Sequence, residues 1–336
     1  GGTFTDAVLI LDGRVFAGKA ASTPGDQSEG ALAAASQVLE QAGIEGSDVS
    51  FFAHGMTVAT NALLERKVAD AAFVATRGFA DLIEIGRQNR PSLYRLELRP
   101  PPPLVPTGRR FELAERMGPD GTILEPDQAE LDRVAEAVAS AGVESVAVCL
   151  LNSYVNPANE RRVADHLRRE LGVPVCISSD ISPQIREYPR MITTACNAAT
   201  MPVIGPYLDE LQKWLSAEGY GGSVLMMLSN GGVVSADDAA QAPIRLVESG
   251  PAAGALAGTW FARRLGEERL LCFDMGGTTA KACLIQGGEP ELTNTFEVAR
   301  AYRFKKGSGF PVSVPSVDLV EIGAGGGSLG RVDQFG

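Results

Sequence analysis

The sequence has few of the residues that most often carry nucleophilic or metal-dependent chemistry. Its 336 residues include two histidines and five cysteines. The cysteines, at positions 149, 176, 196, 272 and 283, are odd in number and lack the paired spacing of a metal site. All except Cys196 lie in apolar, strand-like runs, where a free buried thiol is typical. Cys196 lies in a more polar setting, but so few histidines to serve as a base do not favour a nucleophilic role.

The sequence also lacks an excess of positive charge and any long apolar run. Its formal net charge is −11, whereas a nucleic-acid partner requires a basic surface. No stretch approaches about 18 uninterrupted apolar residues, so no membrane span is predicted. No signal peptide is visible either. Together with the unpaired cysteines, these features predict a cytoplasmic protein with neither nucleic-acid nor membrane partners.

The remaining composition is that of a soluble globular protein, with 45% apolar and 21% charged residues. A chain of this length predicts two lobes with sizeable cores. Strand-like runs at 71–75, 145–151 and 173–178 alternate with helical patterns at 130–141 and 157–171. This rhythm predicts an α/β fold with a mostly parallel sheet. Residues 182–215 favour helix but contain three prolines, so two or three helices are expected there.

Residues 272–281 read CFDMGGTTAK: the end of an apolar strand, an acidic residue, two glycines and two hydroxyls. Paired glycines let the backbone turn sharply, and the successive N–H groups of such a turn suit an anion. The hydroxyls of Thr278 and Thr279 add donors, and Asp274 can hold a hydrated Mg²⁺ on that anion. The pattern predicts a phosphate-binding hairpin, although a glycine-rich hairpin can also be purely structural.

The first thirteen residues repeat this pattern. GGTFTDAVLILDG at 1–13 agrees with GGTTAKACLIQGG at 276–288 at both leading glycines, the threonine, a Leu-Ile pair and the closing glycine. Such self-similarity predicts two hairpins of the same kind, one in each half of the chain. The Asp-Gly pair at 12–13 is a strong hairpin signal. Two facing turns that hold one polyphosphate between related lobes are the simplest use of this repeat.

These two stretches resemble the phosphate motifs of the hydantoinase A/5-oxoprolinase family, which belongs to the actin-like, sugar-kinase and Hsp70-type ATPase fold. The resemblance extends to HGMTVATNA at 54–62, GRQNRPSLY at 86–94, SGPAAG at 249–254 and IGAGGGS at 322–328. It implies an α/β fold with two RNase H-like lobes, mixed sheets covered by helices, and an inter-lobe cleft. We expect an N-terminal region at 1–178 and an ATPase region at 179–336.

The resemblance also implies that ATP and Mg²⁺ bind in this cleft. The phosphates would be held by Gly1, Gly2, Thr3, Thr5, Gly276, Gly277, Thr278 and Thr279. Asp6 and Asp274 would orient the metal and its waters, and Lys281 would complete the catalytic groups. In actin-like ATPases a glycine-rich loop packs under the adenosine. Here that loop is predicted at Gly323, Gly325, Gly326, Gly327 and Ser328.

The activity implied by the family is ATP-dependent ring-opening hydrolysis of a cyclic amide such as hydantoin or 5-oxoproline. The γ-phosphate activates a carbonyl oxygen, and the phosphorylated imidate is then hydrolysed, usually with a hydantoinase B-type partner subunit in an oligomer. A second branch of the family is the ATP-using subunit of a ketone carboxylase. The same fold also supports a nucleotide-dependent, chaperone-like switch and small-molecule kinases, so fold alone does not choose among them.

Polar residues at the ends of predicted strands are candidates for substrate contact, because open α/β sheets bind ligands at the carboxyl ends of their strands. His54 ends one short strand; it either lines the cleft or is a core histidine satisfied by backbone. Thr57 and Asn61 follow at the start of a helix. Ser229 and Asn230 end another strand, where a plain turn is equally possible.

A helix of small residues is predicted to begin at residues 249–251 and to continue to residue 261. The N-terminus of such a helix suits an anion. Glu248, just before it, is a candidate metal ligand or base. The glycines at 250, 254 and 258 predict a closely packed helix face. Arg87 and Arg90 are interpreted as part of a solvated loop rather than as an anion-binding site.

Two features set the sequence apart from the family. The family has an acidic residue on a strand just before the first double glycine, and this sequence begins at the glycines without an initiator Met. Family members are also about twice as long. We therefore expect the chain to be the nucleotide-handling part of a longer subunit.

Overall fold

The computed structural model describes residues 4–23, 27–88, 94, 102–276, 280–300, 307–322, 324–329 and 331–332. It begins with an antiparallel hairpin of β1 (Phe4–Leu11) and β2 (Arg14–Ala21), joined by the Asp-Gly turn. Helix α1 (Gln27–Ala42) packs against both strands. It is followed by Gly43, whose φ is +67°, a conformation that glycine adopts at little cost. The predicted first hairpin is confirmed.

A small three-stranded sheet lies beside this hairpin. Strand β3 (Phe52–His54) pairs in parallel with β10 (Val224–Met227), and β10 pairs antiparallel with β11 (Val233–Ser235). Helix α2 (Val58–Glu65) follows β3, and α8 (Ala236–Gln241) follows β11. The pairing of β3 with β10 aligns residues about 170 positions apart, and brings the His54 motif to the second half of the chain.

A second sheet is fully parallel, with strand order β5-β4-β8-β9. Its strands are β4 (Ala71–Thr76), β5 (Arg110–Leu113), β8 (Ser145–Cys149) and β9 (Val175–Ile177), and two of its helices are α4 (Gln128–Ser140) and α5 (Ala158–Leu171). On β4, Ala72 and Val74 pack in one core with α4 and α5, whereas Phe73 and Ala75 face the other core with α7. Both faces are therefore covered, as parallel sheets require. The predicted parallel sheet is confirmed.

Helix α7 (Glu187–Ala217) is a single helix of 31 residues, so the expectation of two or three helices was wrong. Pro189 lies in the first turn, where a missing N–H breaks no intrahelical bond. Pro202 and Pro206 lie inside the helix. Residues 189–201 are all buried, and α7 contacts β8, α2, α8 and β17. This packing offsets the unfavourable helix propensity of the two internal prolines.

Helix α9 (Ser249–Leu265) covers a further sheet, built from β12 (Arg269–Met275), β13 (Ala280–Gln286), β14 (Glu289–Pro290) and β19 (Val320–Ile322). The strand–turn–strand predicted at 272–281 is formed by β12 and β13, and the hairpin predicted from the repeat at 276–288 is formed by β13 and β14. Of the three glycines expected on the packed face of α9, only Gly258 meets a strand closely. A Cβ there would collide with Sγ of Cys272, whereas Gly250 and Gly254 face open space.

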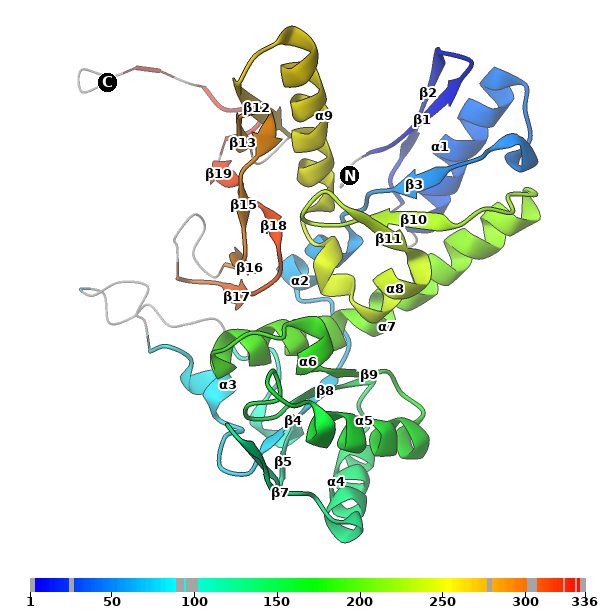
Figure 1. Cartoon of the computed structure of the whole chain (residues 1–336). Helices are drawn as coiled ribbons and strands as arrows, with labels where there is room; N and C mark the ends of the chain where they lie inside the picture. Colours follow the sequence, from blue (N-terminus) through cyan, green and yellow to red (C-terminus); the bar gives the residue numbers. More distant parts are fainter. Residues whose placement is uncertain are drawn as a thin grey trace.

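The other elements are short: α3 (Leu82–Ile85), α6 (Ser178–Ile181), β6 (Arg116–Gly118), β7 (Gly121–Leu124), β15 (Leu292–Thr293), β16 (Phe296–Val298), β17 (Phe310–Val312), β18 (Ser316–Val317) and the 3₁₀ helices η1 (Gly46–Asp48), η2 (Thr107–Arg109) and η3 (Pro243–Leu246). In Figure 1 the parallel sheet lies below α7, and the hairpins β1–β2 and β12–β13 lie above it.

The molecule thus has a mixed α/β fold. The two RNase H-like lobes, the cleft between them and the boundary at residue 178 stay predictions. None of the described helices is both long enough and apolar enough to cross a bilayer.

Candidate functional site

The second predicted phosphate turn joins β12 to β13. Asp274 is the second-last residue of β12, and the antiparallel register places it opposite Lys281 on β13. The Asp274 side chain is exposed and has no hydrogen bond or ion pair with another described residue. Gly276 follows at the end of β12, and the next residues of the turn, Gly277, Thr278 and Thr279, lie outside the described residues. This geometry leaves a carboxylate oxygen accessible directly beside the predicted phosphate turn.

Lys281 forms an ion pair with Glu248, the residue that immediately precedes α9. Both side chains are about one-fifth exposed, at 20% and 21%, so the pair is partly shielded from water. Glu248 has a φ of +66°, an uncommon conformation for a residue with a side chain. Its backbone N–H donates to Oγ1 of Thr60 over 3.1 Å, which helps to hold it in place. The N-terminus of α9 is thereby fixed to the strand that carries Lys281.

The HGMTVATNA stretch meets the start of α9. Besides the bond that Glu248 donates to Thr60, the hydroxyl of Ser249 donates to the carbonyl of Met56 over 3.1 Å. The two motifs are almost 200 residues apart in sequence, and Ser249 is fully buried at their contact. The structure therefore gathers the 54–62 motif, the 249–254 motif and the second phosphate hairpin around one place.

The glycine-rich loop reaches the same place. Strand β19 pairs with β13, and the backbone N–H of Gly326 then donates to the carbonyl of Gly276 over 3.1 Å. Within the loop, Gly325 N–H donates to the hydroxyl of Ser328 over 3.0 Å. Gly326 and Gly327 face open space. The predicted adenosine loop thus lies against the predicted phosphate turn; Gly323 lies outside the described residues.

Lys281 borders two cavities. The smaller, of about 80 Å³, is also lined by Asp274, Pro251 and Gly254. The larger, of about 710 Å³, is lined on its charged side by Arg87, Glu248, Lys281, Glu297, Arg300, Asp318 and Glu321. Lys281 and Glu248 thus connect the predicted phosphate turn with a space large enough for a small organic substrate.

The first phosphate hairpin is described from Phe4 onward. Asp6 on β1 forms an ion pair with Lys19 on β2 over 2.6 Å, and both side chains are largely exposed. Asp6 lines a cavity of about 170 Å³, whereas Asp274 lines the separate cavity of about 80 Å³. Gly1, Gly2 and Thr3 lie outside the described residues, as does Thr278. The meeting of the two turns around one triphosphate therefore stays a prediction.

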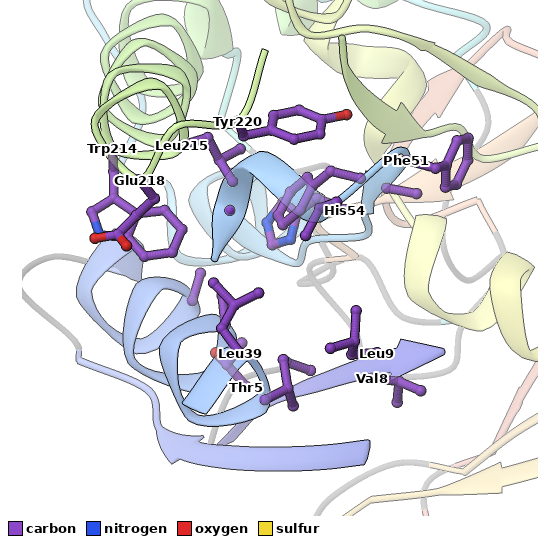
Figure 2. Close-up of a pocket in the computed structure, with 18 of the residues that line it drawn as sticks. Thr5, Val8, Leu9, Leu39, Phe51, His54, Trp214, Leu215, Glu218 and Tyr220 are labelled. Atoms are coloured by element: carbon purple, nitrogen blue, oxygen red, sulfur yellow. The ribbon is translucent and has the colours of Figure 1, made fainter. Parts of the chain in front are cut away.

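His54, at the end of β3, borders the same cavity as Asp6 (Figure 2). Its Nε2 lies 2.6 Å from the hydroxyl of Tyr207 on α7. Burial lowers the pKa of His54 to about 4, so the ring is neutral at pH 7. Thr57 directly precedes α2, and its hydroxyl accepts a bond from the Asn61 side chain over 3.4 Å. No sequence motif indicated Tyr207, and substrate contact by His54, Thr57 and Asn61 stays a prediction.

Ser229 and Asn230 are tied into a turn. The Ser229 hydroxyl is buried and donates to the carbonyl of Arg245 over 2.6 Å. Oδ1 of Asn230 accepts the N–H of Gly232 over 3.0 Å. Asn230 also lines a cavity of about 320 Å³ with Ser182 and Arg245. A plain turn explains the hydrogen bonds of both residues, and a substrate role for them stays a prediction.

The buried thiols are poor nucleophiles. Burial raises the pKa of Cys149, Cys176 and Cys196 to about 12, so each stays protonated at neutral pH. All five cysteines are free, in keeping with the sequence expectation. Chemistry at the candidate site is therefore expected to depend on its charged groups and not on these thiols.

Comparison with known proteins agrees with this arrangement of motifs. The description "Hydantoinase/oxoprolinase N-terminal region" matches residues 1–171, and "Hydantoinase/oxoprolinase" matches residues 190–336. The chain belongs to the hydantoinase/oxoprolinase family. The resemblance inferred from the motifs is confirmed, because the two matched regions together span nearly all of the chain.

Several relatives of this hydantoinase/oxoprolinase chain are known. An uncharacterized protein of Methanocaldococcus jannaschii is 38% identical over 344 residues, or 99% of this chain and 50% of its own length. Caprolactamase subunit alpha of Pseudomonas jessenii is 31% identical over 345 residues, covering 100% of this chain and 48% of the relative. The crystal structure of ATP-dependent caprolactamase from that organism matches with a TM-score of 0.81 at 30% identity, over 100% of this chain and 48% of that one.

A nucleotide-free structure of acetone carboxylase, from work on ATP-dependent acetone carboxylation, matches with a TM-score of 0.83 at 28% identity. The match covers 99% of this chain and 48% of that one. The chain spans about half the length of these relatives. The family therefore includes both ATP-dependent amide hydrolases and ATP-dependent ketone carboxylases.

Proposed function

We propose that this chain binds ATP with Mg²⁺ and phosphorylates the carbonyl oxygen of a small cyclic amide, the step that prepares the ring for hydrolysis. The observation that carries the proposal is the position of Lys281. It lies one strand away from Asp274 at the phosphate turn, pairs with Glu248, and borders the 710 Å³ cavity. ATP dependence in the caprolactamase and acetone carboxylase relatives supports the same nucleotide here.

The proposed chemistry has balanced steps. The carbonyl oxygen of the ring attacks the γ-phosphorus of ATP, the bond to the β,γ-bridging oxygen breaks, and ADP leaves. The ring nitrogen loses its proton, giving a phosphorylated imidate. Water then adds to the former carbonyl carbon, and the ring C–N bond breaks with protonation of nitrogen, which leaves an acyl phosphate. A second water attacks the acyl carbon and the C–O bond to the phosphate breaks, so a carboxylate forms and the original carbonyl oxygen leaves in inorganic phosphate.

The chain's own residues act mainly by position and charge, as phosphoryl transfer requires. Lys281 lies where its ammonium group can neutralise charge on the transferred phosphoryl group, and Glu248 holds that ammonium in place. The N–H groups of the glycine turn bind phosphate oxygens. The loop 325–328, held to Gly276, gives the flat adenine base a surface without side chains. The large polar cavity accommodates the amide beside Lys281.

The donors present fit Mg²⁺. This ion prefers oxygen ligands and is commonly held by one or two carboxylates plus substrate phosphates and waters. The Asp274 carboxylate is accessible and unpaired among the described residues, which suits a direct or water-mediated contact. Asp6 would have to exchange its bond with Lys19. When bound, the ion neutralises charge on the phosphates.

A hydantoinase B-type partner subunit is the expected site of the hydrolytic steps. The caprolactamase relative is described as a subunit alpha, which supports an assembly of unlike subunits here. The similarity to acetone carboxylase, with a TM-score of 0.83, supports a second candidate function. This function is the ATP-dependent activation of a ketone enol and bicarbonate. Both candidates use the same nucleotide site and differ in the occupant of the large cavity.

The test uses the purified protein with its partner subunit, ATP, Mg²⁺ and a panel of lactams, hydantoins and ketones. We expect ADP formation to depend on one cyclic amide, in equal amount to the ring opened. With ¹⁸O in the amide carbonyl, label should appear in inorganic phosphate. Dependence on ketone plus bicarbonate would assign the carboxylase branch. A stable phosphorylated product, or stimulation by polypeptide alone, would contradict both.

A further inference from the structure

Two free cysteines lie opposite each other on neighbouring strands. Cys272 on β12 and Cys283 on β13 are direct partners in the antiparallel register. The Cα atoms of such partners are about 5.5 Å apart in a hydrogen-bonded pair and about 4.5 Å apart in a non-hydrogen-bonded pair. Both separations fall within the range of roughly 4.4–6.8 Å that a disulfide spans. The backbone therefore allows a bond between the two sulfurs while the strands stay paired.

Both thiols lie on the face of the sheet that α9 covers. Sγ of Cys272 lies 3.4 Å from the carbonyl oxygen of Gly254, and Cys283 shares a small core with Ala252 and Ala255 of α9. Burial is the main cause that raises the pKa of Cys283, and the proximity of the Cys272 sulfur is the next. The two sulfurs are therefore close enough to interact.

The pair is also accessible from one side. Cys272 and Cys283 both line the cavity of about 80 Å³ that Asp274 and Lys281 border. Residues two apart on a strand share a face, so the cysteine pair is the next row of side chains along the sheet from the Asp274–Lys281 pair. Cys272 is partly exposed, whereas Cys283 is 3% exposed. A small oxidant therefore meets Cys272 first.

The other three cysteines are placed differently. Cys149 lies opposite Ala75 and Cys176 opposite Ala147 in the parallel sheet, and Cys196 lies on α7. All three are buried in the large core, and burial raises the pKa of each to about 12. They provide an internal control for any reaction that requires an accessible thiol.

We propose that Cys272 and Cys283 form a redox-sensitive modification site, at which a hydroperoxide converts the two thiols into a cross-strand disulfide. The Cys272 thiolate attacks one oxygen of the hydroperoxide, the O–O bond breaks, and water or an alcohol leaves with the proton of that thiol. This gives a sulfenic acid. The Cys283 sulfur attacks the sulfenic sulfur, the S–O bond breaks, and hydroxide leaves with the Cys283 proton as water. The dithiol loses two electrons, which reduce the hydroperoxide.

The disulfide changes the spacing of the strands beside Asp274 and Lys281. Cβ atoms of a cross-strand pair are about 4.5–5.5 Å apart, whereas those of a disulfide are about 3.8 Å apart. The bond therefore draws β12 and β13 together by roughly 1 Å at the adjacent pair, and misplacement by about 1 Å can lower a rate by roughly 100-fold. We expect oxidation to lower ATP turnover by about tenfold or more. This consequence rests on the proposed function; formation of the disulfide does not.

The experiment treats the full protein with hydrogen peroxide, alkylates the remaining thiols after denaturation, and maps disulfides by peptide mass spectrometry. We expect a disulfide between Cys272 and Cys283, reversed by dithiothreitol, with the other three cysteines alkylated. Cys283→Ala should stop at the sulfenic acid of Cys272, which dimedone traps. Cys196→Ala is the matched control and should form the disulfide as the unsubstituted protein does.

The disulfide in the unsubstituted protein, with the trapped sulfenic acid in Cys283→Ala, would support the proposal. Three results would overturn it: no disulfide, a disulfide that joins other cysteines, or oxidation of Cys272 to a sulfinic acid while Cys283 stays a thiol. Mapping of the unsubstituted protein requires neither a variant nor ATP turnover, so failure of the proposed function would not hide failure of this site. The disulfide with unchanged turnover would support the site and contradict the roles proposed for Asp274 and Lys281.

Discussion

Lys281 is the residue on which the contacts of the candidate site converge. It faces Asp274 across the β12–β13 pair, bonds Glu248 and borders two cavities. We expect Lys281→Met to lower ATP-dependent turnover by roughly 100-fold, because removing one group that stabilises transition-state charge costs this much. Steady-state ADP release measures the change, and Lys281→Arg should retain part of the rate.

The matched control is Lys67→Met. Lys67 also pairs with a glutamate, Glu65, but is largely exposed and lies outside the cavities beside Lys281. Its replacement should leave turnover unchanged. Equal losses in the two variants would mean that Lys281 acts only through general stability or surface charge.

His54 gives a prediction about pH. Its folded-state pKa of about 4 lies below the ordinary value of 6.5. Between these values the unfolded chain binds a proton that the folded chain does not, so the contribution of His54 to stability is present above pH 6.5 and is lost as pH falls toward 4. His54→Gln removes this titration and can keep a bond to Tyr207.

Thermal unfolding across pH 4–7 measures the effect. The Tm of the wild-type chain should fall more steeply with decreasing pH than that of His54→Gln. Parallel curves for the two proteins would show that the pKa of His54 does not differ between the folded and unfolded chains.

At the residue scale, the sequence located the groups but not their partners. The turn motif pointed to Asp274 and Lys281, and Glu248 was a candidate from its place before a helix. The ion pair between Lys281 and Glu248, and the bond from Glu248 to Thr60, join residues 33 and 188 positions apart. No local spacing encodes such contacts, since they depend on how α9 packs on β12–β13. The same holds for Tyr207 and His54.

Two helices give opposite predictions for the same substitution. Gly205 lies inside α7 with open space around the position of a Cβ. Gly205→Ala should therefore raise the free energy of unfolding by about 1 kcal/mol, because glycine weakens a helix interior. Gly258→Ala in α9 should lower it, because the added methyl group collides with Cys272.

Urea unfolding of the two single variants measures both signs in one protein. Stabilisation by Gly258→Ala would mean that α9 lies farther from β12 than the structure places it. Destabilisation by Gly205→Ala would mean that α7 needs the flexibility of glycine near its prolines.

At the element scale, local signals predicted the hairpin β1–β2, the strand–turn–strand of β12 and β13, and the parallel sheet. The signals are the Asp-Gly turn of the first, the paired glycines of the second, and the alternation of apolar strands and helical patterns in the third. Helix α7 was predicted incorrectly because Pro202 and Pro206 suggested breaks. Its long buried face, which packs against strands and helices from both halves of the chain, kept it continuous. The stabilisation comes from tertiary packing, which local sequence patterns do not indicate.

At the scale of the whole molecule, motifs far apart in sequence meet through α9, β13 and the loop 325–328. The resemblance predicted that these motifs share one site, and the contacts of Gly326 with Gly276 and of Ser249 with Met56 agree with that. The prediction that the two phosphate turns face each other concerns Thr3 and Thr278, which lie outside the described residues. It depends on how two halves of the chain dock, which the repeat itself does not encode.

Calorimetric titration of Mg²⁺-ATP into the full protein tests that central claim most directly. If both turns hold one triphosphate, the stoichiometry is one, and Thr3→Ala and Thr278→Ala each weaken binding by about tenfold, the loss expected for one hydrogen bond to a charged group. Thr122→Ala, on the distant β7, should have no effect. Two independent sites, or an affinity unchanged by Thr3→Ala, would contradict the account.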